Sequence, residues 1–421
     1  MRILLTNWRL EHRAGSELYL LDVARWLRDH GHVPVAYAAR LGPFADEIRA
    51  EAIAVIDDLR LMAEPPDVIH GQHHLATMTA ICRFPAVPVV AFCHGWVPWE
   101  ETPVRHPAIR RYVAVSSHTR ERLVLESGID PNLVSVIPNF VDLKRFAMRE
   151  VIADRPQRAL LFSNYALPGV DWVEAVAAGC AARGLSLEIA GLGYGKPVER
   201  PDKYLGGFDV VFAKARAALE AMATGAAVVL CDAAGLGPLV MPDNFDELRA
   251  GNFGMLVLRA AHDPALVEAA IGEYDRDRVA SVAQMVRGTL GLQAIVPRVF
   301  ELYEQAIADA TARPTDQADA TDALALYLFQ LNKLDPQPVE PIRAHYEKEL
   351  DRAYRALDRQ SAALEANREV ESIERDRQRL TSDREQATAE LQALLNSTTW
   401  RMTAPLRWLG RRARKVRHWL P

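Results

Sequence analysis

Two basic residues stand where a helix is predicted to begin. In the stretch "FAKARAALEAMATG" (212–225), an apolar strand ends near Phe212, and Lys214 and Arg216 follow at the start of a helix that contains Glu220. Cations at a helix N-terminus oppose the macrodipole, so a helix built only for stability would avoid them. A bound anion would remove this conflict. The pattern predicts an anion site at Lys214 and Arg216, and the alternative is two solvated side chains on a surface loop.

A glycine follows the first predicted strand. In "RAGSELYLL", Gly15 stands at the start of a helix, where the absence of a side chain lets a phosphate or sugar reach the backbone N–H groups. The alternative is a plain N-cap by Ser16, with Glu17 favourable in the first turn. The residues alone leave both interpretations of Gly15 open.

Histidines stand near the ends of two other predicted strands. His94 in "VVAFCHGW" lies just past an apolar strand, and the carboxyl ends of strands in open α/β sheets face the ligand crevice. It could hydrogen-bond a substrate hydroxyl, or it could be a packed loop residue. His70, His73 and His74 cluster in "DVIHGQHH", but no neighbouring ligand completes a zinc set. No D-x-D pair stands at a strand end, so we expect chemistry without a metal ion or other cofactor.

The composition indicates at least two folded domains. The chain has 421 residues, of which 49% are hydrophobic and 25% charged, and this length exceeds one typical core. The net charge of -5 argues against a general nucleic-acid binder. The 4 cysteines are far apart, which indicates neither a disulfide framework nor a zinc ribbon. No signal peptide is apparent, and no apolar run approaches the roughly 20 residues that span a bilayer. We therefore expect a cytoplasmic protein.

Two series of predicted strands alternate with helices. Residues 1–150 contain "RILLTN", "VPVAYA", "DVIHG", "VPVVAFCHG" and "RYVAVSS". Residues 151–310 contain "RALLFS", "LSLEIAG", "FDVVFA", "AAVVLCD" and "FGMLVL", and then a helix through "VPRVFELYEQAIADA". Such alternation is typical of β-α-β units around a parallel sheet. The sequence predicts an α/β protein with two Rossmann-like domains, joined at a turn that contains Pro138 and Asn139.

The C-terminal part has a different pattern. Residues 311–339 begin with the polar stretch "TARPTDQADATD" and are predicted to be a linker. Residues 340–395 are dense in Glu, Arg, Gln and Ala, and Leu350, Leu357 and Leu364 recur at seven. This spacing favours a coiled coil and a homo-oligomer. A single solvated helix braced by i,i+4 charge pairs is the alternative.

The last segment, 396–421, is basic and amphipathic. It contains seven Lys and Arg residues and no acidic residue, and apolar residues recur at three and four with Trp408 and Trp419 beside them. An apolar stripe opposite a basic face suits an anionic membrane surface. Nucleic acid is the competing partner for a basic tail, but the two tryptophans favour lipid.

Six of these stretches together are similar to the retaining glycosyltransferases of family 4. They are "AGSELYLLDVARWLRDHGHVPVAY", "DVIHGQHH", "VAVSSHTRERL", "VSVIPNFVDLKRF", "LEIAGLG" and "ALEAMATGAAVVLCD", in the family's order over residues 1 to about 310. The resemblance implies the GT-B architecture, in which two Rossmann-like domains face each other across a cleft. It also implies that the first domain binds the acceptor and the second binds the nucleotide sugar.

The resemblance assigns roles to single residues. Glu220 matches the glutamate that accepts hydrogen bonds from the nucleotide ribose, and His94 matches a histidine near the reacting sugar, which makes it the candidate catalytic residue. Gly15 matches one glycine of a donor-binding pair. Gly191 and Gly193 in "GLGYGK" are expected to line the base pocket.

The donor site departs from the family pattern at three positions. Phe212 stands where the family has its first glutamate, and the family's Arg and Lys are missing from "NYALPG". Lys214 and Arg216 resemble the K-x-R arrangement of a subgroup with a compact donor loop. The expectation is therefore that these two cations hold the donor diphosphate.

Two functions remain open from the sequence. The first is a retaining, metal-independent glycosyltransferase that moves a sugar from a nucleotide donor to a lipid-linked glycan at the inner face of the cytoplasmic membrane. The second is a non-catalytic scaffold that organises a polysaccharide assembly complex. "TTWRMTAPLRWL" resembles the W-R-x-T-x-P-L-R ending of bacterial surface-polysaccharide assembly proteins, which suits both functions.

Overall fold

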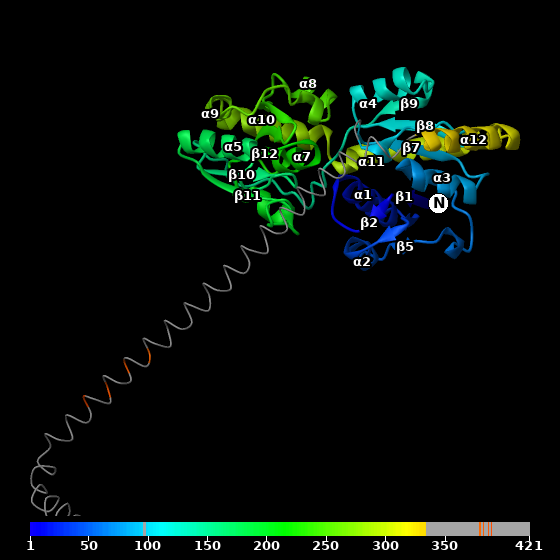
Figure 1. Cartoon of the computed structure of the whole chain (residues 1–421), viewed down its shortest axis with the longest axis horizontal. Helices are drawn as coiled ribbons and strands as arrows, with labels where there is room; N and C mark the ends of the chain where they lie inside the picture. Colours follow the sequence, from blue (N-terminus) through cyan, green and yellow to red (C-terminus); the bar gives the residue numbers. More distant parts are fainter. Residues whose placement is uncertain (96–97, 334–378, 380–381, 383–385, 387–388, 390–421) are drawn as a thin grey trace, which may run out of the picture. The chain divides into compact units, whose positions relative to one another are not determined.

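The computed structural model describes residues 1–95 and 98–333 and the isolated residues 379, 382, 386 and 389. The predicted coiled coil at 340–395, apart from these four residues, and the basic tail at 396–421 lie outside the described residues. The described part of residues 1–333 contains two α/β domains, and each domain is built around its own β-sheet (Figure 1).

The N-terminal sheet has seven parallel strands in the order β5-β3-β1-β6-β7-β8-β9. Its strands are short apolar runs, as expected for strands covered on both faces. Their bounds are β1 (Arg2–Thr6), β3 (Val33–Tyr37), β5 (Ala54–Ile56), β6 (Val68–Gln72), β7 (Val89–Cys93), β8 (Ile109–Ala114) and β9 (Val134–Val136). The helices that connect them are α1 (Gly15–Asp29), α2 (Pro43–Ala50), α3 (His74–Arg83) and α4 (Ser117–Glu121), and two short strands, β2 (Arg9–Leu10) and β4 (Arg40–Leu41), pair beside the sheet. The predicted parallel sheet is confirmed.

The C-terminal sheet has five strands in the order β11-β10-β12-β13-β14. Four are parallel, and β14 runs antiparallel to β13. The strand bounds are β10 (Arg158–Phe162), β11 (Ser186–Ala190), β12 (Val210–Ala213), β13 (Ala227–Asp232) and β14 (Gly235–Leu239). The helices are α5 (Asp171–Ala182), α6 (Pro201–Tyr204), α7 (Ala215–Ala223), α8 (Phe245–Ala250), α9 (Pro264–Gly272) and α10 (Arg276–Thr289).

The prediction of a last strand in this sheet, at "FGMLVL", is wrong. "FGMLVL" contains the 3-10 turn Met255–Val257, and the edge of the sheet is instead β14. The β14 segment reads "GLGPL", whose two glycines and one proline hide its strand character in the sequence. Proline is tolerated there because β14 is an edge strand.

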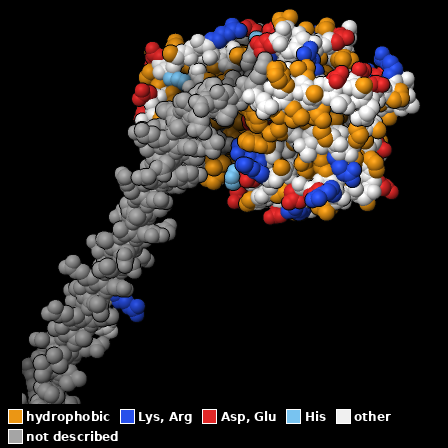
Figure 2. Space-filling view, turned by 45° about the vertical axis from the view of Figure 1, so that its right-hand side comes forward, with side chains coloured by type: hydrophobic (Ala, Val, Ile, Leu, Met, Phe, Trp, Pro, Cys, Tyr) orange, Lys and Arg blue, Asp and Glu red, His pale blue; other side chains and the backbone are white. Residues whose placement is uncertain are grey.

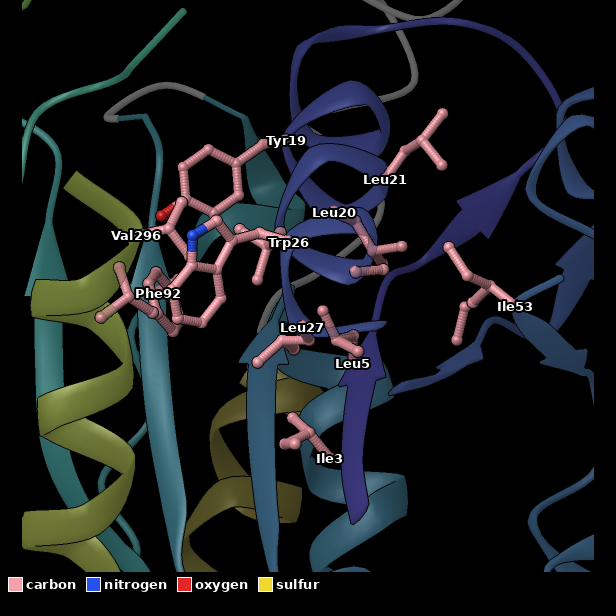
Figure 3. Packing of buried hydrophobic residues seen from close by; sticks show 14 of the residues in the cluster. Ile3, Leu5, Tyr19, Leu20, Leu21, Trp26, Leu27, Ile53, Phe92 and Val296 are labelled. Atoms are coloured by element: carbon pink, nitrogen blue, oxygen red, sulfur yellow. The ribbon is translucent and has the colours of Figure 1, made fainter. Parts of the chain in front are cut away.

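Helix α11 (Leu292–Ala312) returns from the second domain to the first. Its buried residues recur at intervals of three and four and belong to the hydrophobic cluster of the N-terminal domain. Figure 3 shows Tyr19 and Trp26 of α1 pointing toward Phe92 of β7 and Val296 of α11. The domain boundary predicted at 310 therefore needs a correction, because α11 belongs by packing to the N-terminal core.

The predicted linker at 311–339 is also wrong over most of its described part. Residues Gln317–Lys333 form helix α12, in which Ala320 and Tyr327 are buried. Leu324 and Leu331 pack against the same N-terminal cluster as Tyr327. The polar composition of "TARPTDQADATD" concealed this helix, because its apolar contacts begin only at Ala320. Within the described residues, no helix is long and apolar enough to cross a membrane.

Figure 2 shows one face of the described part. Hydrophobic side chains gather toward the middle of this face, and basic and acidic side chains alternate around its rim. Mixed charge of this kind creates no single-sign field on this face.

A buried polar contact joins α11 to the N-terminal sheet. The Tyr303 hydroxyl and Nδ1 of His70 are 2.6 Å apart, and both side chains are fully buried. The substitution Tyr303→Phe should lower the free energy of unfolding by about 1–3 kcal/mol, because His70 loses a partner that water cannot replace. Urea denaturation measures this change. Tyr165→Phe is the matched control, since Tyr165 is 63% exposed; equal losses in the two variants would show that the α11 contact contributes nothing specific.

Candidate active site

The carboxyl ends of the parallel strands position the predicted site residues. Gly15 begins α1 after β1, His94 follows β7, and Arg216 and Glu220 lie on α7 after β12. In open parallel sheets these ends carry the ligand-binding loops. Among them, the structure brings Arg216 and Glu220 of the second domain against Asp22 on α1 of the first.

Arg216 lies between two carboxylates. Its Nε donates a 2.8 Å hydrogen bond to Oε1 of Glu220, one helical turn away, and its guanidinium also donates to Asp22. Asp22 is 1% exposed and faces Arg25 and Arg145 as well, each at 3.4 Å. One ionic cluster therefore ties α1 to α7.

The pKa shifts of this cluster follow from its burial. Burial lowers the pKa of Arg216, but the attraction of Asp22 and Glu220 outweighs burial and raises this pKa above its ordinary value. Burial raises the pKa of Glu220, and the charge of Arg216 acts against that rise. Arg216 is therefore a permanent cation, held in position on both sides by acidic groups.

Lys214 points to a different carboxylate. It is the N-cap residue of α7, and its ammonium group forms an ion pair with Asp232 at the end of β13. Asp232 also accepts a 2.6 Å hydrogen bond from the Ser163 hydroxyl, and the Lys214 ammonium lies 5.2 Å from the centre of the Tyr165 ring. The conflict between these cations and the α7 dipole is thus offset within the protein by carboxylates. Whether Lys214 and Arg216 hold a diphosphate stays a prediction.

The turn into α7 is held by the backbone of another loop. Ala215 has a left-handed φ of 48°, which is uncommon for a residue with a side chain. Its N–H donates a 2.7 Å hydrogen bond to the carbonyl of Phe253. This contact fixes the direction in which Lys214 and Arg216 leave the turn.

The three predicted glycines have different structural roles. A side chain added at Gly15 would meet nothing within 4 Å, so packing within the protein does not require glycine there. A Cβ at Gly191 would lie 2.0 Å from the Ser163 carbonyl oxygen, and one at Gly193 would lie 2.6 Å from that of Ala166. Close backbone packing therefore accounts for Gly191 and Gly193, and their contact with a base stays a prediction.

The alternative role of Ser16 as an N-cap is wrong. Ala14 is the extended N-cap residue of α1 and makes no side-chain capping bond. The Ser16 hydroxyl donates instead to the carboxylate of Glu17, at 2.9 Å. The backbone N–H groups at this end of α1 receive no cap from Ser16, which leaves the ligand-binding interpretation of Gly15 open.

His94 lies against an aromatic side chain and a buried acid. Its backbone N–H donates a 2.9 Å hydrogen bond to Glu101, and its ring centre is 4.7 Å from that of Tyr19. Burial lowers the pKa of His94 to about 4, so the imidazole is neutral at neutral pH. Its Nε2 atom is buried and has no hydrogen-bond partner among the described residues.

Other unpartnered polar atoms lie on α1 and at the carboxyl ends of β1 and β6. Within the described part of the chain, the hydroxyl of Tyr19, Nδ2 of Asn7 and Oε1 of Gln72 are also buried without partners. Asn7 directly follows β1, Gln72 ends β6, and His94 directly follows β7, so three neighbouring strands of the sheet end in such atoms. Buried polar groups normally have partners, so these atoms mark a place for water or a polar ligand.

The sequence reasoning missed Asn7, Tyr19 and Glu101. A signal existed for Asn7, which stands directly after the first predicted strand in "RILLTN". Tyr19 lies inside an ordinary amphipathic helix and carries no such signal. Glu101 is 7% exposed and lies in a 3-10 turn (Trp99–Glu101) that the sequence does not indicate.

The three clustered histidines contact different partners. His70 bonds Tyr303, His74 bonds Tyr327 at 2.8 Å, and Nε2 of His73 lies 3.5 Å from Oε1 of Glu101. Within residues 1–95 and 98–333, no group of three or more His, Cys, Asp or Glu side chains could hold a metal ion. His70 in β6, His73 in the turn after it and His74 at the start of α3 thus make separate contacts.

The first domain resembles a known protein family. Residues 13–145 match the model of the family described as Glycosyltransferase Family 4. The first domain is thus similar to this family over residues 13–145. No curated protein matches the sequence.

Solved structures extend the comparison to both domains. A protein from Anabaena, HepE, crystallised with UDP and glucose, is 14% identical with a TM-score of 0.53, and the match covers 72% of this chain and 99% of that chain. A glycosyltransferase from Rickettsia africae is 13% identical with a TM-score of 0.48, covering 73% and 98% of the two chains. MurG from Acinetobacter baumannii is 15% identical with a TM-score of 0.42, covering 72% and 100%. The match to HepE supports the predicted GT-B fold, and this fold together with the similarity to family 4 supports a glycosyltransferase.

The buried histidines make stability depend on pH. The pKa values of His74 and His94 are about 4 because burial disfavours their charged forms. In the unfolded chain these rings bind protons near pH ~6.5, so the unfolded state binds more protons between the two values. The free energy of unfolding should therefore fall as the pH is lowered from about 6.5 to about 4.

Urea denaturation across this pH range measures the effect. His94→Gln should make the fall shallower, because glutamine takes up no proton in either state. His12→Gln is the control, since His12 is an exposed side chain outside the site. The same slope in His94→Gln and in the unaltered protein would contradict the assignment of a neutral buried imidazole.

Proposed function

We propose that the protein transfers a sugar from a nucleotide-sugar donor to a glycan acceptor. The observation that carries this proposal is the beginning of α7, where Lys214 is the N-cap residue and Arg216 and Glu220 lie on the helix. Arg216 contacts α1 of the domain that matches the family 4 model. HepE, which shares the fold, was crystallised with UDP and glucose, and this supports a nucleoside diphosphate as the leaving group here.

The proposed donor site contains cations that can stabilise the negative charge of that leaving group. A departing diphosphate develops negative charge that needs cations or helix N-termini when no metal ion supplies them. In our proposal, Lys214 and Arg216 bind the two phosphates, and the carboxylate of Glu220 accepts hydrogen bonds from the ribose hydroxyls. The donor phosphates then replace Asp232 and Asp22 as partners of the two cations. Retention of the anomeric configuration and independence of metal are parts of the same proposal and rest on the resemblance to the family.

The proposed acceptor side is the cluster of unpartnered atoms in the first domain. Tyr19 and His94 offer a hydroxyl and a neutral imidazole nitrogen that lack partners among the described residues. Sugar hydroxyls both donate and accept hydrogen bonds, so they suit such a mixed set. We assign His94 to the reacting sugar, as a hydrogen-bonding group and not as a cation.

A non-catalytic scaffold is the second candidate function. The observation that favours it is the burial of Arg216 between Asp22 and Glu220, which already neutralise its charge. In that case the domains would keep the fold for structural reasons and organise a polysaccharide assembly complex. Nucleotide binding separates the two functions, because only the enzyme requires it.

Calorimetry with UDP and GDP on the full-length protein tests the donor site. Lys214→Ala or Arg216→Ala should weaken binding by about 1–3 kcal/mol, the range for hydrogen bonds to charged groups. Glu220→Gln should weaken it through the ribose. Lys203→Ala, at an exposed position of the same domain, should leave it unchanged.

The design separates binding from folding. Arg216→Ala leaves two buried carboxylates without their main partner, so circular dichroism must accompany the titration. Lys214→Ala carries less risk because its side chain is 24% exposed. Unchanged affinity in both variants would remove these residues from the site, and failure of the unaltered protein to bind either nucleotide would favour the scaffold.

We also propose a position at the inner face of the cytoplasmic membrane, with a lipid-linked acceptor. The support comes from the sequence of segment 396–421, where seven basic residues occur without an acidic one, next to Trp408 and Trp419. The heptad spacing in 340–395 supports self-association of the chain through a coiled coil. Both segments lie outside the described residues, apart from the four isolated ones.

Vesicle co-sedimentation tests the membrane proposal. The full-length protein should bind vesicles that contain anionic lipid, and deletion from Thr398 onward should abolish binding. Each basic residue contributes up to about 1 kcal/mol near such a surface, and salt screens this contribution. Trp408→Ser with Trp419→Ser should leave an interaction that high salt removes entirely. Full-length protein that stays in the supernatant at low salt would overturn the membrane assignment.

A further inference from the structure

A cavity lies at the amino ends of the N-terminal strands. It has a volume of about 670 Å³ and is formed by the segment that leads into β8, the loop before β9, the end of α11 and the helix α12. Residues 105–112 precede or begin β8, so this cavity lies at the amino ends of the strands, away from the carboxyl ends where His94 and Gly15 stand. Figure 1 shows α12 beside the β7–β8 side of the sheet.

Four arginines line this cavity, and only one of them forms an ion pair with a described carboxylate. Arg111 forms an ion pair with Asp309. The other acidic lining residue, Asp130, accepts a 2.9 Å hydrogen bond from the backbone of Asn132. The remaining three arginines form no ion pair with any described residue; they are Arg105, Arg110 and Arg313.

The guanidinium of Arg110 is held in place by hydrogen bonds, but one of its donors has no partner. It donates hydrogen bonds to the carbonyl of Arg313 at 2.8 Å and to the hydroxyl of Thr315 at 2.9 Å. Its Nε is buried and has no partner among the described residues. A guanidinium that is fixed in position and has one free N–H donor can bind an anion without further rearrangement.

The charges of the cavity oppose one another. Burial lowers the pKa of Arg110, Asp309 acts against this, and the positive charge of Arg313 lowers the pKa further. Like charges near a partly buried site are unfavourable unless an anion lies between them. The chain nevertheless brings Arg110 and Arg313 together through a direct hydrogen bond between their residues.

The rest of the lining is apolar. Ile109 and Leu133 contribute from the sheet side, and Leu326 of α12, which is 43% exposed, contributes from the helix side. The volume falls within the range of about 300–1,000 Å³ that is typical of small-molecule sites. It exceeds the need of a lone phosphate, so the remaining space suits an apolar group attached to the anion.

We propose that this cavity binds a phosphate or diphosphate group carried on an apolar chain, with Arg105, Arg110 and Arg313 on the phosphate oxygens and Leu326 against the chain. The ligand can come from a membrane, as a lipid headgroup, or from solution, as a phosphate ester. This site is separate from the proposed donor site, so its existence does not depend on the proposed glycosyl transfer.

Calorimetry on the full-length protein tests the site, with inorganic pyrophosphate and geranyl diphosphate as probes. The titrations use the Lys214→Ala background, which weakens phosphate binding at the proposed donor site. Geranyl diphosphate should bind more tightly than pyrophosphate because of the apolar lining. The double variant Arg105→Gln with Arg313→Gln should weaken both by about tenfold or more, the effect of losing hydrogen bonds to a charged group.

Controls keep the outcome decisive if a variant misfolds. Arg105 and Arg313 are exposed, so their replacement spares the core, whereas Arg110→Gln is a second variant that removes the buried donor. Arg298→Gln is the matched control, since Arg298 is exposed on α11 and donates to the Val136 carbonyl outside the cavity. Absence of binding by both probes, or equal losses in the control and the double variant, would overturn the proposal.

Vesicles of equal parts phosphatidylglycerol and phosphatidylcholine distinguish the two sources. If the Arg105 and Arg313 replacements weaken vesicle binding as well as geranyl diphosphate binding, the lipid headgroup is the ligand. If they weaken only geranyl diphosphate binding, a soluble phosphate ester is the ligand. Either result supports the cavity as the site.

Discussion

The buried charge of Arg216 constrains how the two α/β domains of this molecule contact each other. A guanidinium cannot be deprotonated at physiological pH, so its burial requires carboxylates in contact with it. Glu220 comes from the same helix at i,i+4, but Asp22 comes from α1 of the other domain. The distance between the two helices is therefore set by an ionic contact that neither domain could form alone. Removing one partner of such a contact costs about 3–5 kcal/mol, which makes it a strong constraint on how α1 and α7 face each other.

The hydrophobic contacts of α11 also hold the two domains together. This helix follows the second domain in the chain but packs its apolar face into the core of the first. The indole of Trp26 on α1 donates a 3.1 Å hydrogen bond to Gln293 of α11, and Tyr303 contacts His70 of β6. The chain thus crosses between the domains at both 140 and 291, where Val141 and Gly291 pair as an isolated bridge. Two crossings and one ionic cluster hold the carboxyl ends of the two sheets to a common region.

Local patterns in the sequence predicted most strands of the two sheets, but not β5, β9 and β14 and not the contacts between the sheets. Apolar runs separated by helical periodicity predict β1, β6, β7, β10, β12 and β13, because strands buried on both faces leave a continuous signal. The edge strand β14 carries a proline and two glycines and leaves none. Helix α12 was missed because its first turns are polar and only its tertiary contacts bury Ala320 and Tyr327. The cations at Lys214 and Arg216 were found through their conflict with the helix dipole, but their carboxylate partners were not. Asp22 is 194 residues from Arg216, and no local rule joins them.

The surroundings of Asp22 decide whether the closed ionic cluster is compatible with a bound diphosphate. A donor phosphate that took Arg216 would leave Asp22 buried, and an isolated buried carboxylate is costly. Asp22 is not isolated, however, because Arg25 and Arg145 each lie 3.4 Å from it and would remain as cationic partners. Likewise, Asp232 would keep the hydroxyl of Ser163 if Lys214 turned to a phosphate. Both carboxylates thus have a second partner that does not depend on the predicted cations. If phosphates took Lys214 and Arg216, Asp22 would keep two cationic partners and Asp232 would keep a hydrogen bond, so the ionic cluster is compatible with a donor site that is occupied by the protein's own acidic groups until the nucleotide binds.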